Sequence, residues 1–592
     1  MSITQPIWTN LEGMQSSEGL YAIDLSITKM IVKDHPHVSE NAAAFLSLLI
    51  ASARQGHLCL KIEENRIIPS AAELMEDALF AESLTAMALL GVKEIPLDLI
   101  SKTEESLRPL CQMGQCYYLQ KNWFFEGRFI SQIMRLKGYL ISDALSNASI
   151  APHLNERQKR AVEMALSNSF SIITGGPGTG KTFTAAQIVR ALISSTDEPL
   201  RKDLRIILAA PTGKAAAHLE KNVRKLLPPE VKLRSGTLHM LLSIRSSEDM
   251  MKPAPHLHAD LLIIDEASMI DARLFSYFLS SIQEGARVVL MGDKDQLPPV
   301  DSGSLFADLV DISLQHDFLA CSELIESLRS DRKQILDFAS AVNARDIAQM
   351  HEIFLREDSS LQRMNFFCKE NSIKRSYELL WDYSKEYFPS ALEVQLLPED
   401  LLQKFDRFRI LSCTRKGPMG VEAINSFFAT RFHTKAAVGD LLARPILITK
   451  NDYTLDLFNG EVGVLLQKKK KDSRFDSEDM AYFYDKSSLS IRKIPAIMLG
   501  SFEYAYCLSV HKSQGSEYDN VVILAPEGSE VFGKEVLYTA VTRAKISVLI
   551  DASDEVLKNL VYRSSRKISG LRARLQLTGE NPCLGASHSV SS

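Results

Sequence analysis

The sequence predicts an α/β protein, and three features of its central part lead to this prediction. A short apolar, β-branched run at 170–174 is followed by a glycine-rich segment and then by helical spacing at 183–193. Apolar runs of similar length recur at 205–210, 260–264 and 287–291, and polar residues follow each of them. An alanine-rich helix start follows the second run. Strands that alternate with helices in this way form a parallel sheet covered by helices.

The glycine-rich segment after the first run fits the pattern G-x-x-x-x-G-K-[ST]. Its glycines let the backbone curl so that several N–H groups face one anion, with a helix N-terminus behind them. Lys181 would reach the β- and γ-phosphates of a nucleotide, and the Thr182 hydroxyl would bind Mg²⁺. The alternative is a glycine-rich turn without a ligand. The candidate residues for binding ATP here are Gly175, Gly176, Pro177, Gly178, Thr179, Gly180, Lys181 and Thr182.

Two carboxylates, Asp265 and Glu266, directly follow the apolar run at 260–264. Asp265 would hold Mg²⁺, directly or through water. Glu266 could orient and deprotonate the attacking water. Adjacent acids at a strand end are common by chance, but downstream of a phosphate-binding loop they indicate nucleotide hydrolysis.

Other polar side chains lie where the predicted strands begin or end. Gln158 precedes the first strand on a helix that Asn155 can cap, and its amide could bond the adenine edge. Gln296 lies in the loop after 287–291, where it could sense the γ-phosphate. Residues 232–256 have mixed polarity and predict a small insertion. His239 lies within this segment and is either a functional residue or a buried histidine with satisfied hydrogen bonds.

Composition is that of an ordinary globular protein, with 45% hydrophobic and 24% charged residues. No apolar run reaches membrane-spanning length, the N-terminus has no signal-peptide pattern, and none of the eight cysteines forms C-x-x-C, so we expect a cytoplasmic protein. The net charge of −5 does not indicate nucleic-acid binding. Basic residues do cluster at 201–234 and 563–574, either as phosphate-binding surfaces or as solvated faces.

The first 145 residues contain no nucleotide motif and predict a mainly helical domain. Helical spacing occurs at 42–53 and 71–90. The segment 116–123 predicts a short strand pair that leads to a helix at 127–140. Its aromatic side chains could form a partner surface or a buried core.

Several motifs in a fixed order resemble those of superfamily-1 DNA helicases, and in particular their RecD-like group. Gly292 to Pro298 is similar to motif III of that superfamily. The other matching segments are 209–216 (motif Ia), 261–269 (motif II), 505–517 (motif V) and 536–544 (motif VI). The matching motifs span residues 155 to about 550, so the resemblance is specific.

This resemblance implies two RecA-like P-loop NTPase lobes with the nucleotide between them. It also implies a hairpin-like insertion in lobe 1 and an SH3-like β barrel in lobe 2. The expected units are the N-terminal domain (1–145, a contact for partner subunits), lobe 1A (146–330, with insertion 1B at about 232–256), linking helices and the start of lobe 2A (331–430), insertion 2B (431–500), the rest of lobe 2A (501–577) and a disordered tail (578–592).

The resemblance also implies roles for individual residues. Gln296 would couple the γ-phosphate to the DNA groove, and Gln158 would contact adenine. Arg329 and Arg543 would supply guanidinium groups to the transferring phosphoryl group. The implied DNA contacts are Pro211, Thr212, Lys214, Thr237, His239, His511, Lys512 and Ser513. The four-lysine run 468–471 would be a mobile loop, with DNA contact as the lesser alternative.

The implied activity is ATP-dependent unwinding of DNA by a motor that moves along single-stranded DNA, 5′ to 3′. In the subunit type, this motor works with a RecB-like helicase-nuclease and a RecC-like scaffold in double-strand break repair by homologous recombination. We see no nuclease carboxylate cluster in the sequence. The alternatives are a free-standing RecD-like helicase and a nucleotide-switched clamp that does not unwind. The motifs alone leave RNA open as a substrate.

Overall fold

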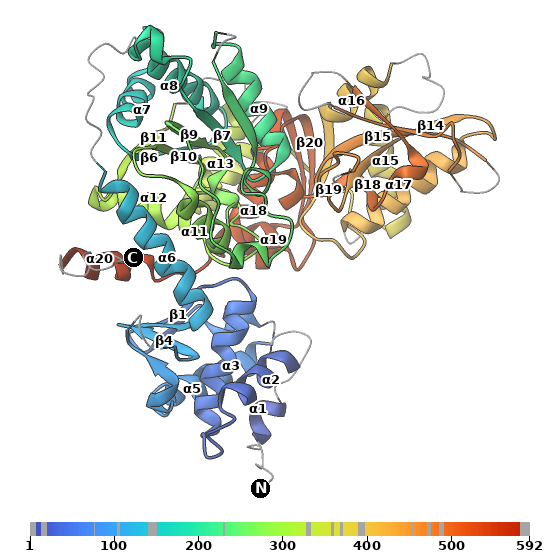
Figure 1. Cartoon of the computed structure of the whole chain (residues 1–592). Helices are drawn as coiled ribbons and strands as arrows, with labels where there is room; N and C mark the ends of the chain where they lie inside the picture. Colours follow the sequence, from blue (N-terminus) through green and yellow to red (C-terminus); the bar gives the residue numbers. More distant parts are fainter. Residues whose placement is uncertain are drawn as a thin grey trace.

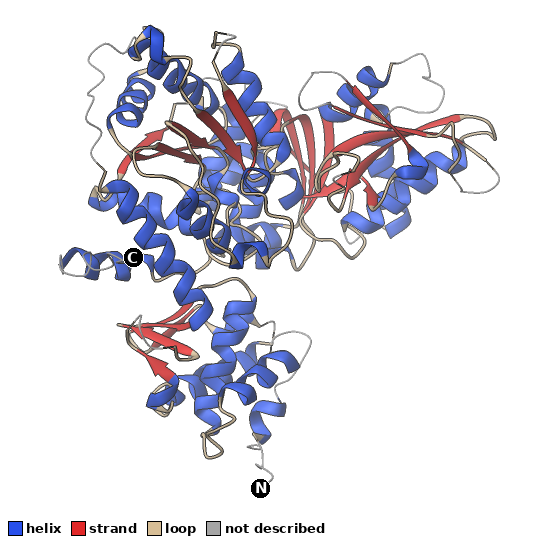
Figure 2. Ribbon diagram, viewed as in Figure 1, coloured by secondary structure: helices blue, strands red, loops and turns tan. Residues whose placement is uncertain are grey.

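The computed structural model describes most of the chain in four folded parts (Figures 1 and 2). Arg329, Lys471 and most of the tail expected at 578–592 lie outside the described residues. Within the described residues, no helix is both long and apolar enough to cross a membrane. The described ranges are 8–13, 20–75, 77–103, 107–139, 151–228, 231–326, 333–356, 360–367, 371–388, 397–452, 454–470, 475–484 and 491–580.

Lobe 1 is a parallel sheet with the strand order β11-β6-β10-β9-β7-β8. Its strands are β6 (Phe170–Gly175), β7 (Ile206–Ala210), β8 (Leu233–Thr237), β9 (Leu261–Ile264), β10 (Arg287–Gly292) and β11 (Ala320–Leu324). The flanking helices are α7 (Glu156–Ser167), α8 (Lys181–Ser195), α9 (Gly213–Arg224), α11 (Ala272–Ser281) and α12 (Leu305–His316). Side chains alternate along each strand, so the sheet contributes to one core with α7, α8 and α9 and to another with α11 and α12. The sequence therefore predicts this α/β layer correctly.

The segment 232–256 is not the hairpin-like insertion that we expected. Its first residues form β8, which pairs in parallel with β7 as an edge strand of the main sheet. An edge strand is only half-buried, which explains its mixed polarity. Thr237 then caps α10 (Leu238–Leu241) through its hydroxyl. The His239 side chain is exposed, so the alternative of a buried histidine is wrong.

Lobe 2 is a second parallel sheet, with the strand order β12-β21-β20-β13-β19. The strands are β12 (Leu361–Met364), β13 (Phe408–Ser412), β19 (Cys507–Ser509), β20 (Tyr518–Leu524) and β21 (Ala544–Asp551). The helices are α13 (Lys333–Ala344), α14 (Ile347–Phe354), α15 (Ile373–Ser384), α16 (Pro398–Arg407), α17 (Val421–Lys435), α18 (Gly533–Val541) and α19 (Asp554–Tyr562). Figure 1 shows lobe 2 beside lobe 1, with α18 toward lobe 1.

An antiparallel sheet interrupts lobe 2, in the region where we expected a small β insertion. Its strand order is β17-β16-β15-β14-β18. The strands are β14 (Leu441–Ile448), β15 (Val462–Lys468), β16 (Met480–Tyr484), β17 (Ile491–Pro495) and β18 (Phe502–Tyr504). The sheet has its own small core around Ile446, Leu465 and Phe483. Figure 2 shows it extending to the side of the molecule, away from lobe 1.

The N-terminal domain combines helices with a small sheet of order β2-β1-β5-β4-β3. The elements are α1 (Thr9–Gly13), α2 (Ala22–Ile31), α3 (Glu40–Arg54), α4 (Ala71–Leu74), α5 (Ala78–Gly91), α6 (Gln120–Lys137), β1 (Cys59–Glu63), β2 (Arg66–Ile68), β3 (Ile100–Ser101), β4 (Leu110–Met113) and β5 (Cys116–Leu119). The strand pair predicted within 116–123 is wrong. Only β5 lies there, and its partners are β1 and β4, so α6 starts at Gln120 rather than at 127.

The segment after α19 crosses back over lobe 1 and reaches the N-terminal domain; we name residues 563–576 the C-terminal strap. The strap includes the start of α20 (Leu571–Glu580), which lies next to α6 (Figure 1). Two of its basic side chains form ion pairs with other parts of the chain: Arg566 pairs with Asp311 at 2.7 Å, and Arg574 pairs with the buried Glu126 at 3.4 Å. The cluster at 563–574 is therefore not simply a solvated face, because Arg566 and Arg574 pair with acids of other parts of the chain.

Candidate nucleotide site between the two lobes

All six strands of lobe 1 end at the same edge of its sheet, because they are parallel. Thr174 of β6 lies opposite Gly292 of β10, and Ile264 of β9 lies opposite Leu290. The loops that follow these strands carry the residues expected to bind the phosphates of the nucleotide. The carboxyl edge of an open parallel sheet is where such folds bind their ligands.

The phosphate-binding loop has the backbone that its glycines permit. Gly178 (φ 78°) and Gly180 (φ 86°) adopt left-handed conformations, which side chains disfavour. Lys181 begins α8, and its ammonium group donates to the carbonyls of Gly175 and Gly176 at 2.6 and 3.1 Å. The cation therefore lies against the loop itself, where phosphate oxygens would replace these carbonyls as its partners.

Gln158 lies under the loop rather than at its outer side. Its side chain is 2% exposed, and its amide nitrogen donates to the Thr179 carbonyl at 3.3 Å. Its backbone N–H donates to the Asn155 carboxamide at 2.8 Å, which completes the predicted helix cap. Gln158 thus supports the loop in this conformation, and a contact with adenine remains a prediction.

Asp265 and Glu266 follow β9; Asp265 is buried and Glu266 is half-buried. Burial raises the pKa of Asp265 above its usual value, and the nearby Lys181 ammonium lowers it. Glu266 adopts a left-handed backbone conformation (φ 54°) that is rare for this residue type. Such strain occurs preferentially at functional sites.

Arg543 of lobe 2 lies within electrostatic range of Glu266. Burial and the neighbouring Asp265 raise the pKa of Glu266, whereas Arg543 and Lys181 lower it. The Arg543 guanidinium is 3% exposed and is held by the carbonyls of Thr539 and Ser516 at 3.1 and 3.2 Å. Cationic groups from both lobes therefore act electrostatically on one carboxylate, Glu266.

A buried hydrogen-bond network joins the loop after β10 to α18 of lobe 2. Asp293 accepts from the Tyr538 hydroxyl at 2.9 Å and from the Gln296 amide nitrogen at 3.2 Å. The Gln296 amide oxygen is buried and has no hydrogen-bond partner among the described residues. We assigned no role to Tyr538 from the sequence. Its only signal there is a phenolic hydroxyl within an otherwise apolar stretch of helix.

Leu297 anchors the same loop in lobe 2. Its side chain is 1% exposed and packs in the lobe 2 core with residues of α18. Its N–H donates to the Thr539 hydroxyl at 2.9 Å, and its carbonyl accepts from Gln514 at 3.1 Å. The loop that we expected to sense the nucleotide is therefore bonded to the facing lobe.

Three of the predicted DNA contacts follow β7 in lobe 1. Pro211 and Thr212 are partly exposed, and Thr212 caps α9 through its hydroxyl. Lys214 is exposed and lies 3.8 Å from Asp406 of lobe 2. A side chain at Gly515 would contact Thr212, so the two lobes approach each other closely here. These residues lie beside the lobe junction and remain candidates.

The predicted contacts in lobe 2 differ in how accessible they are. His511 and Lys512 are partly exposed, and Lys512 is paired with Glu503. Ser513 is fully buried, and its hydroxyl donates to the Val510 carbonyl at 2.7 Å. A direct DNA contact by the Ser513 side chain does not fit this geometry, because the 3₁₀ turn at 511–513 folds it inward.

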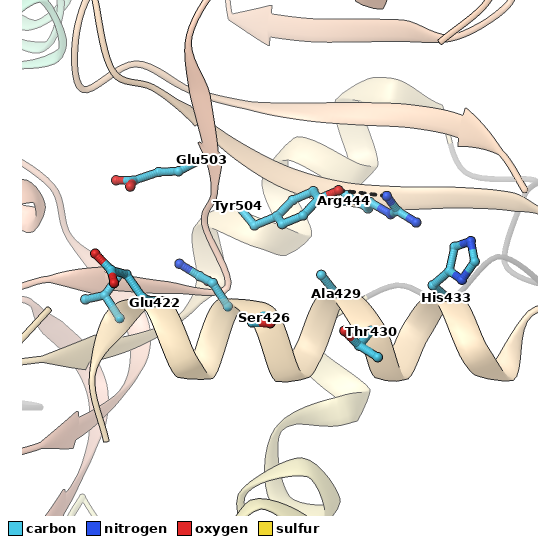
Figure 3. Close-up of a pocket in the computed structure, with 10 residues that line it drawn as sticks. Glu422, Ser426, Ala429, Thr430, His433, Arg444, Glu503 and Tyr504 are labelled. Carbon is cyan, nitrogen blue, oxygen red and sulfur yellow. Dashed lines mark hydrogen bonds between the residues drawn. The ribbon is translucent and has the colours of Figure 1, made fainter. Parts of the chain in front are cut away.

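A cavity of about 520 Å³ lies between α17 and strands β14 and β18 (Figure 3). Ser426, Thr430 and His433 line one side, and Arg444 donates to the Tyr504 hydroxyl at 2.8 Å on the other. None of the residues predicted to bind the nucleotide lines this cavity.

Two family models match the chain in the two lobes. The model of an AAA domain matches residues 158–302, and the model of a UvrD-like helicase C-terminal domain matches residues 504–550. The first match covers the strands of lobe 1 from β6 to β10, and the second covers β19, β20, α18 and most of β21. Both cover the segments that meet at the candidate site.

Curated relatives match over more of the chain. The RecBCD enzyme subunit RecD of Mycobacterium tuberculosis is 34% identical over 442 residues, which are 72% of this chain and 74% of the relative. The same subunit of Mycolicibacterium smegmatis is 28% identical over 93% of this chain and 96% of the relative. The ATP-dependent RecD2 DNA helicase of Deinococcus radiodurans is 28% identical over 66% of this chain and 48% of the relative. The chain therefore belongs to the RecD family of ATP-dependent superfamily-1 DNA helicases.

Proposed function

We propose that this chain is a motor that moves along single-stranded DNA, 5′ to 3′, and serves as the RecD-type subunit of a helicase-nuclease in double-strand break repair. The observation that carries the proposal is that charged groups of both lobes, Lys181, Asp265 and Glu266 of lobe 1 and Arg543 of lobe 2, lie within electrostatic range of Glu266 or of Asp265 beside it. Charged groups this far apart in the chain have no evident structural reason to lie near one strained, half-buried carboxylate, Glu266.

In the proposed reaction, Glu266 takes the proton of the attacking water. Lys181 and Arg543 stabilise the negative charge that develops on the transferring phosphoryl group. Because Arg543 belongs to the second lobe, it acts only when the cleft is closed. Hydrolysis and release would then let the lobes separate, so that grip on the DNA alternates between them.

The donor set of Thr182 and Asp265 fits Mg²⁺. Hydroxyl and carboxylate oxygens are the hard ligands that Mg²⁺ prefers, and one or two protein groups are sufficient when phosphates supply others. When bound, Mg²⁺ would neutralise phosphate charge. Arg329 follows β11, whose last residue lies opposite Gly175, and we retain it as a candidate second arginine.

DNA would cross the tops of both lobes along Pro211, Thr212 and Lys214 and then along His511 and Lys512. Thr237 and His239 would extend this path in lobe 1. The antiparallel sheet of lobe 2 would be the SH3-like insertion of the family. The 5′-to-3′ direction of translocation is taken from the family alone, because no residue pattern in this chain determines it.

The N-terminal domain would contact partner subunits of the RecB and RecC types. The alignment with the M. smegmatis subunit covers 93% of this chain, whereas the alignment with the RecD2 helicase covers 66%. The subunit-type relative thus resembles more of the chain. Co-expression with RecB-like and RecC-like proteins should give one complex in size-exclusion chromatography.

The test is ATP hydrolysis and strand displacement by the purified chain and by its Lys181→Ala variant. We expect single-stranded DNA to stimulate hydrolysis more than RNA does, and duplexes with a 5′ tail to be unwound. Lys181→Ala should lower kcat by at least about 100-fold and keep weak DNA binding. The control, Lys202→Ala, removes an exposed lysine of the same lobe and should change nothing. Unwinding by the Lys181→Ala variant would overturn the proposal.

The similarity to a RecD2 helicase supports a second candidate, a helicase that works alone. A monomer that unwinds DNA without partners and forms no complex on co-expression would favour it. ATP-dependent DNA binding without any strand displacement would instead favour a nucleotide-switched clamp.

A further inference from the structure

We propose that Tyr538 is a positioning residue for ATP hydrolysis, which acts through Asp293 on Gln296. The inference rests on the proposed function and adds to it a second group of lobe 2 besides Arg543. Tyr538 lies on α18, five residues before Arg543, and its side chain is 5% exposed.

The Tyr538 hydroxyl links α18 to two loops of lobe 1. It donates to Asp293 in the loop after β10 at 2.9 Å. A Cβ atom on Gly176 would lie 3.2 Å from the same hydroxyl, so the phenol group lies directly over the phosphate-binding loop. Burial raises the pKa of Tyr538, so the hydroxyl remains a donor at all working pH values. Since Tyr538 belongs to lobe 2, this bond exists only while the lobes are together.

The bond determines how the Gln296 amide is oriented. Asp293 also accepts from the Asp295 N–H at 3.1 Å, so three donors hold its carboxylate in place. An ionised carboxylate can only accept hydrogen bonds, so the amide nitrogen of Gln296 must face it. The amide oxygen is then left buried without a described partner.

An amide oxygen is an acceptor and cannot bind a phosphate oxygen, which is also an acceptor. It can accept a hydrogen from water. Tyr538 thus holds Asp293, Asp293 holds Gln296, and Gln296 orients the water that Glu266 deprotonates. Cleft closure would in this way position the nucleophile, while Arg543 stabilises the charge on the phosphoryl group.

The first test is DNA-stimulated ATP hydrolysis by Tyr538→Phe, which removes only the hydroxyl. We expect kcat to fall about 10- to 100-fold, the loss expected for a hydrogen bond to a charged group, with KM for ATP within about twofold of wild type. The matched control is Tyr506→Phe, since Tyr506 is a fully buried tyrosine of the same lobe whose hydroxyl has no described partner. The control should keep the wild-type kcat.

A double-mutant cycle separates positioning from a structural role. Because Tyr538 acts through Gln296, Tyr538→Phe should lower kcat no further in a Gln296→Ala background. Full additivity of the two losses, or a wild-type kcat for Tyr538→Phe, would overturn the inference. So would a fall in thermal stability that accounts for the lost activity. If Lys181→Ala retains hydrolysis, the proposed function itself fails; if only the Tyr538 results disagree, the inference alone fails.

Discussion

Lobe 1 makes two junctions, and they are built in different ways. Toward lobe 2 it presents single polar contacts, most of them around one loop: Asp293 with Tyr538, and Leu297 with Thr539 and Gln514. The ion pair of Lys214 with Asp406 lies outside this loop. Leu297 is the apolar anchor among them. Toward the N-terminal domain it shares a hydrophobic core with α6, in which Phe129 packs on Phe275 with ring centroids 5.0 Å apart.

The second junction is also closed by the C-terminal strap. Gly570 donates to Glu126 at 2.9 Å, Tyr118 donates to the same carboxylate at 2.9 Å, and Arg574 both pairs with it and lies 3.7 Å from the Trp123 ring centroid. A few polar bonds can exchange with water when two bodies separate, whereas a shared core and a buried ion pair cannot. The comparison indicates that the junction between lobes 1 and 2 opens, whereas the junction between lobe 1 and the N-terminal domain stays closed.

The largest expected effect is at the junction that opens. Glu266→Gln should lower kcat by about 10²- to 10⁴-fold, since it removes the proposed base. It should not lower stability at pH 7: burial raises the pKa of Glu266, so the folded state disfavours the charge that Gln removes. ATPase kinetics and thermal melting at pH 7 check both parts. Loss of activity together with a lower melting temperature would indicate unfolding and contradict the assigned role.

At the junction that holds, Arg574→Met should leave the Glu126 charge buried without its ion-pair partner and lower the free energy of unfolding by about 3–5 kcal/mol. Tryptophan fluorescence during urea unfolding, measured in a background in which Trp8 and Trp381 are replaced by Phe, can report this loss, because Arg574 stacks on the Trp123 ring. The kcat for ATP should change less than about twofold. Arg572→Ala, an exposed change on the same helix, is the control and should cost at most about 0.5 kcal/mol. An equal loss of unfolding free energy in Arg574→Met and Arg572→Ala would mean that the ion pair of Arg574 with Glu126 does not hold the N-terminal domain on lobe 1.

The smallest effect concerns Asp295, at the junction that opens. Burial and the nearby Asp293 raise its pKa to about 6, against Lys294, Arg566 and Lys534, which lower it. The folded pKa lies above the unfolded value, so wild-type stability rises as pH falls through about 6. Asp295→Asn should therefore raise the melting temperature by about 1 °C at pH 7.5 and by less at pH 5. An equal difference at both pH values would contradict this pKa.

The sequence predicts best what depends on local pattern. The strand, loop and helix around Lys181 and the acids after β9 are found where they were expected, because strand ends of a parallel sheet must meet. Arg543 was identified only through its motif. The effect of Arg543 on the pKa of Glu266 depends on how the two lobes pack against each other.

Tertiary pairing explains the other differences. Glu126 and Arg574 are 448 residues apart, and nothing in either local sequence indicates the partner. From the sequence alone, the basic run at 563–574 therefore fits either a phosphate-binding surface or a solvated face. The edge strand β8 looked like an insertion, because one exposed side makes its polarity irregular. Tyr538 was missed because its partner, Asp293, lies in the other lobe.

The measurement that tests this comparison most directly is energy transfer between fluorophores placed at exposed positions of the three parts. Labels at Lys202 (lobe 1) and Glu555 (lobe 2) report the first junction, and labels at Lys93 and Lys202 report the second. We predict that a non-hydrolysable ATP analogue changes the distance between Lys202 and Glu555 and leaves the distance between Lys93 and Lys202 unchanged. An unchanged lobe distance with the analogue bound, or an equal change at both junctions, would contradict the account.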